Sequence, residues 1–290
     1  THDSGAYDTP LGETQDWSVK TQLENGIRFL DVRLSDADAW RHTSDPDCKF
    51  EVRHGPSRLG CFKKIVMDSL NDFLNSNPSE TVFMSIKKED SPIPGENTTF
   101  NIDTFWNHYI YGNDSKFYQS PVDGATPLIY VRGRIVLFNR FSTSNSVGIN
   151  WGNSKLKIQD EYNLGTECWA GVCAPFIGLD YPKKFREVSD HLDAAINDSD
   201  SNKLWINFTS ANYKGFYVSN NADWVNPRTK DYVNKRPSPI RSIVIMDYPN
   251  RTSGIIKSII DNTYISYAIG ASVANTVPKG KYGTLDTDGH

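Results

Sequence analysis

Chemically reactive side chains stand where short apolar runs of this chain end. In chain order they are His2, Asp3, Asp31, Arg33, His54, Lys87, Glu89, Arg140, Asp160, Tyr162 and Asp247. One imidazole can accept a proton, a second can donate one, and a guanidinium can neutralise a phosphate. Two histidines, a fixed cation and partnering carboxylates therefore indicate in-line cleavage of a phosphodiester.

Each of these residues taken alone has an ordinary structural explanation. A strand-end Asp usually caps a helix, a strand-end Arg usually pairs with a carboxylate, and a lone His is usually structural. Lys87 and Glu89 would by themselves read as a solvated charge cluster at the start of a loop. The catalytic hypothesis rests on the whole set.

Seven runs rich in β-branched and aromatic residues predict the strands that position this set. They span residues 27–32, 50–53, 81–86, 134–139, 156–159, 203–208 and 240–246. Helical patterns lie between several of them, for example around Leu70 and Leu192, and this alternation predicts a parallel sheet. In such α/β folds, catalytic groups gather at the carboxyl ends of the strands.

We predict one domain over residues 1–290, a distorted TIM-type (β/α)8 barrel. The segment before the first run looks helical, with Asp16 as a candidate N-cap, so an eighth strand would have to precede residue 1. The stretches 32–50 and 141–155 are too short for a strand connection with a full helix, which predicts an incomplete helical ring.

Composition excludes some classes of partner. The formal net charge is −4 and the pI about 5.9, which does not favour binding to nucleic acid. No apolar run approaches the roughly 18 residues that a transmembrane helix needs. We expect a monomer without a cofactor.

Four cysteines form two close pairs, from which we predict disulfides Cys48–Cys61 and Cys168–Cys173. Reduced thiols or a zinc site are the alternatives, and no His stands at a finger-like spacing near either pair. Asn-x-Ser/Thr sequons agree with a secretory route. These sequons begin at Asn97, Asn113, Asn197, Asn207 and Asn250. Asn207 lies in an apolar run, and we expect it to be buried and unmodified.

Several motifs resemble the bacterial-type phosphatidylinositol-specific phospholipase C family. They are Thr1-His2-Asp3-Ser4-Gly5, Phe29-Leu30-Asp31-Val32-Arg33, Arg53-His54-Gly55-Pro56, Pro78-Ser79-Glu80-Thr81, Lys87-Lys88-Glu89, Gly133-Arg134-Ile135-Val136-Leu137 with Arg140, Gln159-Asp160-Glu161-Tyr162, Ile206-Asn207-Phe208-Thr209-Ser210 and Met246-Asp247-Tyr248. They occur in the family's order through most of the chain. The segment 166–180 has no counterpart, and the sequons suggest a eukaryotic, fungal secretory host.

The resemblance implies a distorted β/α barrel and a role for each matching residue. His2 would be the general base for the inositol 2-hydroxyl, with Asp247 as its partner. His54 would protonate the leaving diacylglycerol oxygen, with Asp3 as its partner. Arg33, fixed by Asp31, would hold the phosphate. The products would be diacylglycerol and inositol 1,2-cyclic phosphate.

The resemblance assigns recognition of the inositol ring to a second group of residues. Lys87, Arg140 and Asp160 would contact its hydroxyls, Tyr162 would pack on its face, and Glu89 would hold the basic neighbours. Trp224 is a candidate for contact with the membrane interface, with a packing role as the alternative. The expected substrate is phosphatidylinositol, with its glycosylated anchors as further substrates.

Arg33 also separates this family from related enzymes. The eukaryotic signalling phospholipases carry a calcium-binding carboxylate at this position, so arginine argues against a catalytic metal. Two alternatives stay open. One is a divalent-metal-dependent glycerophosphodiesterase-like enzyme, and the other is a catalytically silent module that binds inositol lipids.

Overall fold

A computed structural model describes residues 1–37, 45–90, 98–163, 165, 180–213 and 217–263. These residues form two sheets, one with strand order β3-β2-β1-β4-β5-β6 and one with order β7-β8-β9. The strands are β1 (Phe29–Asp36), β2 (Phe50–His54), β3 (Ser57–Cys61), β4 (Thr81–Lys88), β5 (Arg134–Asn139), β6 (Ile149–Asn150), β7 (Leu156–Gln159), β8 (Leu204–Phe208) and β9 (Ser242–Ile245).

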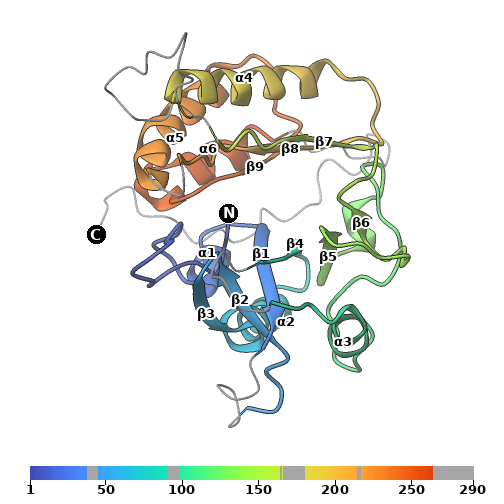
Figure 1. The fold of residues 1–290 in the computed structure, drawn as a ribbon. Coiled ribbons are helices and arrows are strands. Elements are labelled where there is room, and N and C mark those ends of the chain that lie inside the picture. The colour runs from blue at the N-terminus through green and yellow to red at the C-terminus, as the bar shows by residue number, and fades with distance from the viewer. Residues whose placement is uncertain (38–44, 91–97, 164, 166–179, 214–216, 264–290) are drawn as a thin grey trace.

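The helices mostly cover the outside of the sheets. They are α1 (Val19–Glu24), η1 (Lys63–Met67), α2 (Asp68–Ser76), α3 (Ile102–Phe105), η2 (Trp106–Ile110), η3 (Leu128–Tyr130), α4 (Tyr181–Asn197), α5 (Val218–Lys235), η4 (Pro249–Arg251) and α6 (Ile255–Asp261). Figure 1 shows the second sheet with α4 at the top and the first sheet with α1 and α2 at the bottom.

Most strand pairs are parallel, as the alternating pattern predicts. β1 pairs with β4, β4 with β5 and β5 with β6 in parallel, and so do the strands of the second sheet. β2 and β3 differ, because β2 pairs antiparallel with β1 and β3 pairs antiparallel with β2 as a hairpin. The architecture is a distorted α/β barrel. Among the described residues no strand pairing links β6 to β7, so the barrel is open there.

The helical ring is incomplete, as expected from the short connections. The stretch 141–155 contains β6 and no helix, and β5 therefore passes to β7 without a covering layer. The helix before β1 exists, but its N-cap is Ser18, whose side chain accepts a hydrogen bond from the Thr21 N–H. Asp16, the expected cap, instead pairs with Arg251.

Residues 1 and 2 join the two sheets. The amino group of Thr1 donates to the Phe29 carbonyl at 2.6 Å, and the Asp31 N–H donates to the Thr1 carbonyl at 3.1 Å. On the other side the His2 N–H donates to the Met246 carbonyl at 3.0 Å. This is the hydrogen-bond pattern of a parallel strand between β1 and β9. A strand ahead of residue 1 stays a prediction.

Side-chain alternation along the strands builds two cores. Ile135 and Leu137 of β5 pack in the cluster that faces α1 and α2, whereas Val136 and Phe138 pack in the cluster between the two sheets. Because a strand repeats every two residues, the next residue after Phe138 on the inner face is Arg140. The barrel interior is thus apolar along the strands and charged at the carboxyl ends of the strands.

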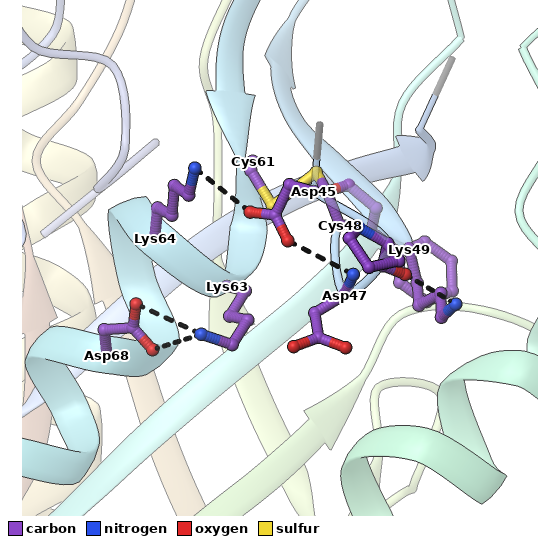
Figure 2. Close-up of a disulfide and its surroundings, with 10 residues drawn as sticks. Asp45, Asp47, Cys48, Lys49, Cys61, Lys63, Lys64 and Asp68 are labelled. Atoms are coloured by element: carbon purple, nitrogen blue, oxygen red, sulfur yellow. Dashed lines mark hydrogen bonds and ion pairs between the residues drawn. A yellow bond between two sulfur atoms is a disulfide. The ribbon is translucent and has the colours of Figure 1, made fainter. Parts of the chain in front are cut away.

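The predicted disulfide between Cys48 and Cys61 is present (Figure 2). It links the segment before β2 to the last residue of β3, with a Cα–Cα distance of 5.5 Å. Lys64 pairs with Asp45 at 3.1 Å beside it. The second predicted pair, Cys168 and Cys173, lies outside the described residues.

Two further expectations concern the burial of Asn207 and the presence of membrane-spanning helices. Asn207 is buried, as expected, and its side chain donates to the Val188 carbonyl on α4 at 2.9 Å. None of the helices in the described part of the chain is long and apolar enough to cross a membrane.

Candidate active site

A cavity of about 230 Å³ opens at the carboxyl ends of the strands. It is lined by His2, Thr14, Arg33, His54, Lys87, Arg140, Asp160, Tyr162, Ser210, Ala211, Asn212, Val218 and Asp247. The structure therefore brings most of the residues predicted from the sequence to one place. Asp3, Asp31 and Glu89 are buried behind the lining.

His2 is held on one side by Asp247, which stands two residues after the end of β9. Its Nδ1 lies 2.8 Å from Asp247 Oδ1, which leaves Nε2 facing the cavity. Burial alone lowers the pKa of His2, but the carboxylates of Asp3 and Asp247 outweigh it and raise the pKa from 6.5 to about 9. The free site thus favours the imidazolium form of His2, although a general base must act as the neutral imidazole.

Asp3 is the centre of the charged cluster. Its Oδ2 lies 3.2 Å from Nε2 of His2 and 3.2 Å from Nε2 of His54, and its Oδ1 lies 2.6 Å from Nε of Arg33. Burial opposes ionisation, yet these three cationic groups hold the pKa of Asp3 well below its usual range. One carboxylate therefore ties both imidazoles to the guanidinium.

His54 is the last residue of β2 and is fixed by a backbone group. Its Nδ1 lies 2.6 Å from the Gly12 carbonyl, so Nδ1 carries a proton and donates it there. Gly12 has φ +77 and lies so close to the ring that a Cβ would meet Nδ1 at 2.8 Å. The loop before α1 can thus hold His54 in this way only with glycine at this position.

Arg33 is fixed by other residues than we expected. Its guanidinium bonds Asp3 and, at 3.4 Å, Glu89, which also accepts the Gly55 N–H at 2.8 Å. The expected pairing of Arg33 with Asp31 is wrong. Asp31 lies two residues earlier on β1, one layer deeper in the barrel, where it bonds Ser85 and, at 3.1 Å, Arg140.

Arg140 and Asp160 line the cavity next to each other. Arg140 Nη2 lies 3.8 Å from Asp160 Oδ2, and its guanidinium lies over Trp151 at 4.3 Å from the ring centroid. Burial raises the pKa of Asp160, and the nearby His2 and Arg140 act against this rise. Tyr162 stands at the rim with 58% of its surface exposed.

Comparison with known proteins finds enzymes that this chain resembles. Residues 4–141 match the sequence profile of the family described as phosphatidylinositol-specific phospholipase C, X domain. A 1-phosphatidylinositol phosphodiesterase of Listeria monocytogenes is 28% identical to this chain over 90% of this chain and 78% of its own length. One of Staphylococcus aureus is 26% identical over 90% of this chain and 87% of its own length.

Solved structures agree with the sequence matches. A phosphatidylinositol-specific phospholipase C from Staphylococcus aureus superposes with a TM-score of 0.72 at 26% identity, covering 91% of this chain and 91% of that chain. The Listeria monocytogenes enzyme gives 0.67 at 28% identity, covering 91% and 92%. The chain is therefore similar to phosphatidylinositol-specific phospholipases C over most of its length, and its residues 4–141 match their X domain.

Two residues that the sequence reasoning missed support the charged cluster. Thr14 donates to the Asp3 carbonyl at 3.1 Å, and Gln15 donates from Nε2 to the His2 carbonyl at 2.7 Å. They come from a loop without periodicity, so no sequence pattern marks them. Ser210, by contrast, stands in a quoted strand-end motif, and its buried hydroxyl at the cavity has no hydrogen-bond partner among the described residues.

Trp224 does not lie in a rim loop, as the polar sequence around it suggested. It is part of α5, is half-buried, and stacks on Tyr181 with ring centroids 5.8 Å apart. Arg228 covers it at 3.7 Å from the ring centroid. Asn221, Asn226 and Thr229 are buried on the same helix, which is why a polar sequence forms a packed helix here. A membrane role for Trp224 stays a prediction.

One group of residues could hold a metal ion. Within the described part of the chain, His2, Asp3 and Asp31 each offer one ligand atom, and these atoms lie within 4.8 Å of one another. Arg33 already bonds Asp3, and Arg140 already bonds Asp31. A divalent cation would have to compete with two guanidinium groups for these carboxylates, so the donor set fits a metal poorly.

Proposed function

We propose that this chain cleaves phosphatidylinositol into diacylglycerol and inositol 1,2-cyclic phosphate. The observation that carries the proposal is the arrangement of His2, His54 and Arg33 around Asp3, with each cationic group within 3.2 Å of a carboxylate oxygen. Two proton carriers and a guanidinium then face one cavity, which is what displacement at a phosphodiester needs. The names of the relatives agree with this activity.

His2 is the proposed general base. Neutral Nε2 accepts the proton of the inositol 2-hydroxyl, whose oxygen attacks the adjacent phosphorus within the same molecule. Asp247 then stabilises the imidazolium through its 2.8 Å contact with Nδ1. Because the pKa of His2 is raised to about 9, only a small fraction is neutral at pH 7, and turnover should rise with pH.

His54 is the proposed general acid, and Arg33 the phosphate ligand. The imidazolium Nε2–H of His54 donates to the departing diacylglycerol oxygen, while the P–O bond to that oxygen breaks. Arg33 neutralises the nonbridging oxygens through its planar fork, which Asp3 and Glu89 hold in place. These groups supply the charge stabilisation that a metal ion would otherwise give.

Recognition of the inositol ring is assigned to four other residues of the cavity lining, Lys87, Arg140, Asp160 and Tyr162. Arg140 and Lys87 offer donors, Asp160 offers an acceptor, and the exposed ring of Tyr162 can lie against the apolar face of the inositol. Glycosylated forms of phosphatidylinositol are further proposed substrates.

We also propose that the protein is secreted, acts as a monomer, and meets its substrate on a membrane surface. The disulfide between Cys48 and Cys61 and exposed Asn113 and Asn197 in two sequons support the secretory route. Besides Tyr162 at the rim, Leu11 and Tyr217 stand exposed near the cavity. They would enter the lipid interface.

A metal-dependent phosphodiesterase is the second candidate, favoured by the cluster of His2, Asp3 and Asp31. Phosphorus NMR of phosphatidylinositol incubated with the protein in excess EDTA separates the two. We expect a cyclic phosphate signal that EDTA leaves intact and that His2→Ala, His54→Ala or Arg33→Ala each suppresses. Loss of turnover on chelation would favour the metal enzyme, and lipid binding without any turnover would favour a silent binding module.

A further inference from the structure

Lys184 is a buried cation that the proposed mechanism does not use. It lies near the start of α4 with 0% of its surface exposed. Its Nζ donates to Gln159 Oε1 at 3.2 Å and to the Glu161 carbonyl at 2.8 Å. Burying an ammonium costs free energy, so a helix that covers a sheet would ordinarily present an apolar side chain at this position.

The two acceptors of Lys184 flank one residue of the cavity. Asp160 stands between Gln159 and Glu161, directly after β7, and its side chain turns inward while that of Gln159 turns outward to α4. Gln159 Oε1 also accepts the Glu161 N–H at 3.1 Å. Lys184 thus fastens the backbone turn from which Asp160 projects.

The same turn is held on its far side. The Asn212 N–H donates to the Tyr162 carbonyl at 2.7 Å, so the segment that carries Asp160 and Tyr162 is fixed at both ends. Asn212 and Tyr162 line the cavity as well. Lys184 is the only charged side chain that holds this segment from behind, as far as the described residues show.

The charges of Lys184 and Asp160 act on each other. Burial raises the pKa of Asp160, and Lys184 is one of the cations that oppose this rise. Burial lowers the pKa of Lys184 to about 8, and Asp160 and Glu161 act against that fall. Lys184 therefore favours the ionised form of Asp160, which is the form that accepts hydrogen bonds from hydroxyls.

We propose that Lys184 is a positioning residue for the inositol subsite, which holds the turn after β7 so that Asp160 and Tyr162 face the inositol ring. This inference rests on the proposed function. Lys184 does not contact the substrate and acts through Asp160 and Tyr162. Its loss should therefore weaken binding of the inositol ring more than it slows the chemical step.

Lys184→Met tests the proposal, with Lys183→Met as the matched control. The two variants change the net charge equally and lie side by side on α4, but Lys183 is exposed. An NMR titration with free myo-inositol should show about tenfold weaker binding for Lys184→Met and unchanged binding for Lys183→Met. With monomeric short-chain phosphatidylinositol, KM should rise while kcat stays within about twofold.

Unchanged myo-inositol affinity in Lys184→Met, beside a wild type that binds, would overturn the role of Lys184 alone. A wild type that neither binds myo-inositol nor cleaves the lipid would overturn the proposed function, and this inference with it. The two failures are therefore distinguishable. A fall in kcat with unchanged KM would also contradict a positioning role.

A second readout separates positioning from general stability. Carbon-13 NMR of the Asp160 carboxyl should show a higher pKa in Lys184→Met than in the wild type, because a nearby positive charge is gone. If Lys184→Met does not fold, Gln159→Met keeps the test, since it removes one of the two acceptors. It should weaken myo-inositol binding in the same direction by a smaller factor, and unchanged binding would contradict the proposal.

Discussion

At the scale of single residues, the site depends on one buried carboxylate. Asp3 contacts both imidazoles and the Arg33 guanidinium, and all three contacts are 3.2 Å or shorter. A buried carboxylate shared by three cations fixes their relative positions before substrate arrives. The phosphate would then meet a preorganised positive site, without the reorganisation that free side chains in water would need.

Asp247→Asn tests the assignment of His2 as base. Asp247 is one of the two carboxylates that raise the pKa of His2 to about 9, so its loss should lower that pKa. The rising acid limb of kcat/KM against pH should then move to lower pH, while the maximal rate falls because the imidazolium loses its partner. Asp231→Asn, exposed on α5, is the control. A limb that stays in place would contradict the assignment.

Arg33→Lys tests the guanidinium. A lysine keeps the charge but loses the planar fork that bonds two phosphate oxygens and contacts Asp3 and Glu89 together. We expect kcat/KM to fall about a hundredfold, equivalent to ~2.7 kcal/mol of transition-state stabilisation. Arg132→Lys, at an exposed position, should have no effect. Near-normal turnover in Arg33→Lys would show that charge alone suffices.

At the scale of elements, the sequence predicts where most strands lie and which reactive residues stand at their ends. Lys87 and Arg140 directly follow the apolar runs that become β4 and β5, so their place after strand ends and the motifs around them predict that they lie at the cavity. The sequence pattern does not show how deep in the barrel a side chain lies. Asp31 and Arg33 face the same side, and only the register of β1 against β4 shows that Asp31 belongs to a lower layer.

The direction of each strand in the sheet could not be predicted from the sequence either. The run that becomes β2 looks like the other strands, but it turns back at Gly55 and pairs with β3 as a hairpin. Its antiparallel direction depends on contacts with β1 that are distant in sequence, and the disulfide between Cys48 and Cys61 holds both ends of this unit. Local pattern alone does not decide such pairings.

The double variant Cys48→Ser with Cys61→Ser tests the contribution of that disulfide. The two cysteines are 13 residues apart, and closing a loop of this length stabilises a protein by about 3 kcal/mol through the unfolded chain. We expect the free energy of unfolding in urea to fall by about that amount, with kcat little changed at temperatures where both proteins are folded. An unchanged denaturation midpoint would show that the bridge contributes no stability.

At the scale of the whole molecule, the two ends of the barrel expose different apolar groups. Leu11, 70% exposed, belongs to the loop that also holds His54 through Gly12 at the carboxyl end of the strands. Ile129, 55% exposed, precedes β5 and so lies at the amino end. If the cavity mouth meets the membrane, only the first of these side chains can enter lipid.

Leu11→Ser against Ile129→Ser therefore tests the orientation of the protein on a membrane. Transfer of one leucine side chain from water to lipid is worth about 1.5 kcal/mol or more, so Leu11→Ser should weaken binding to phosphatidylinositol-containing vesicles by about tenfold. Ile129→Ser should leave binding unchanged, because residue 129 lies at the opposite end of the barrel from the cavity mouth. Hydrolysis of monomeric short-chain phosphatidylinositol should be the same in both variants, since neither Leu11 nor Ile129 lines the cavity and the Leu11 carbonyl, which accepts from Ser57, is kept. The reverse order of vesicle affinities in a sedimentation assay would place the opposite end of the barrel on the membrane, where the substrate could not reach His2 and His54.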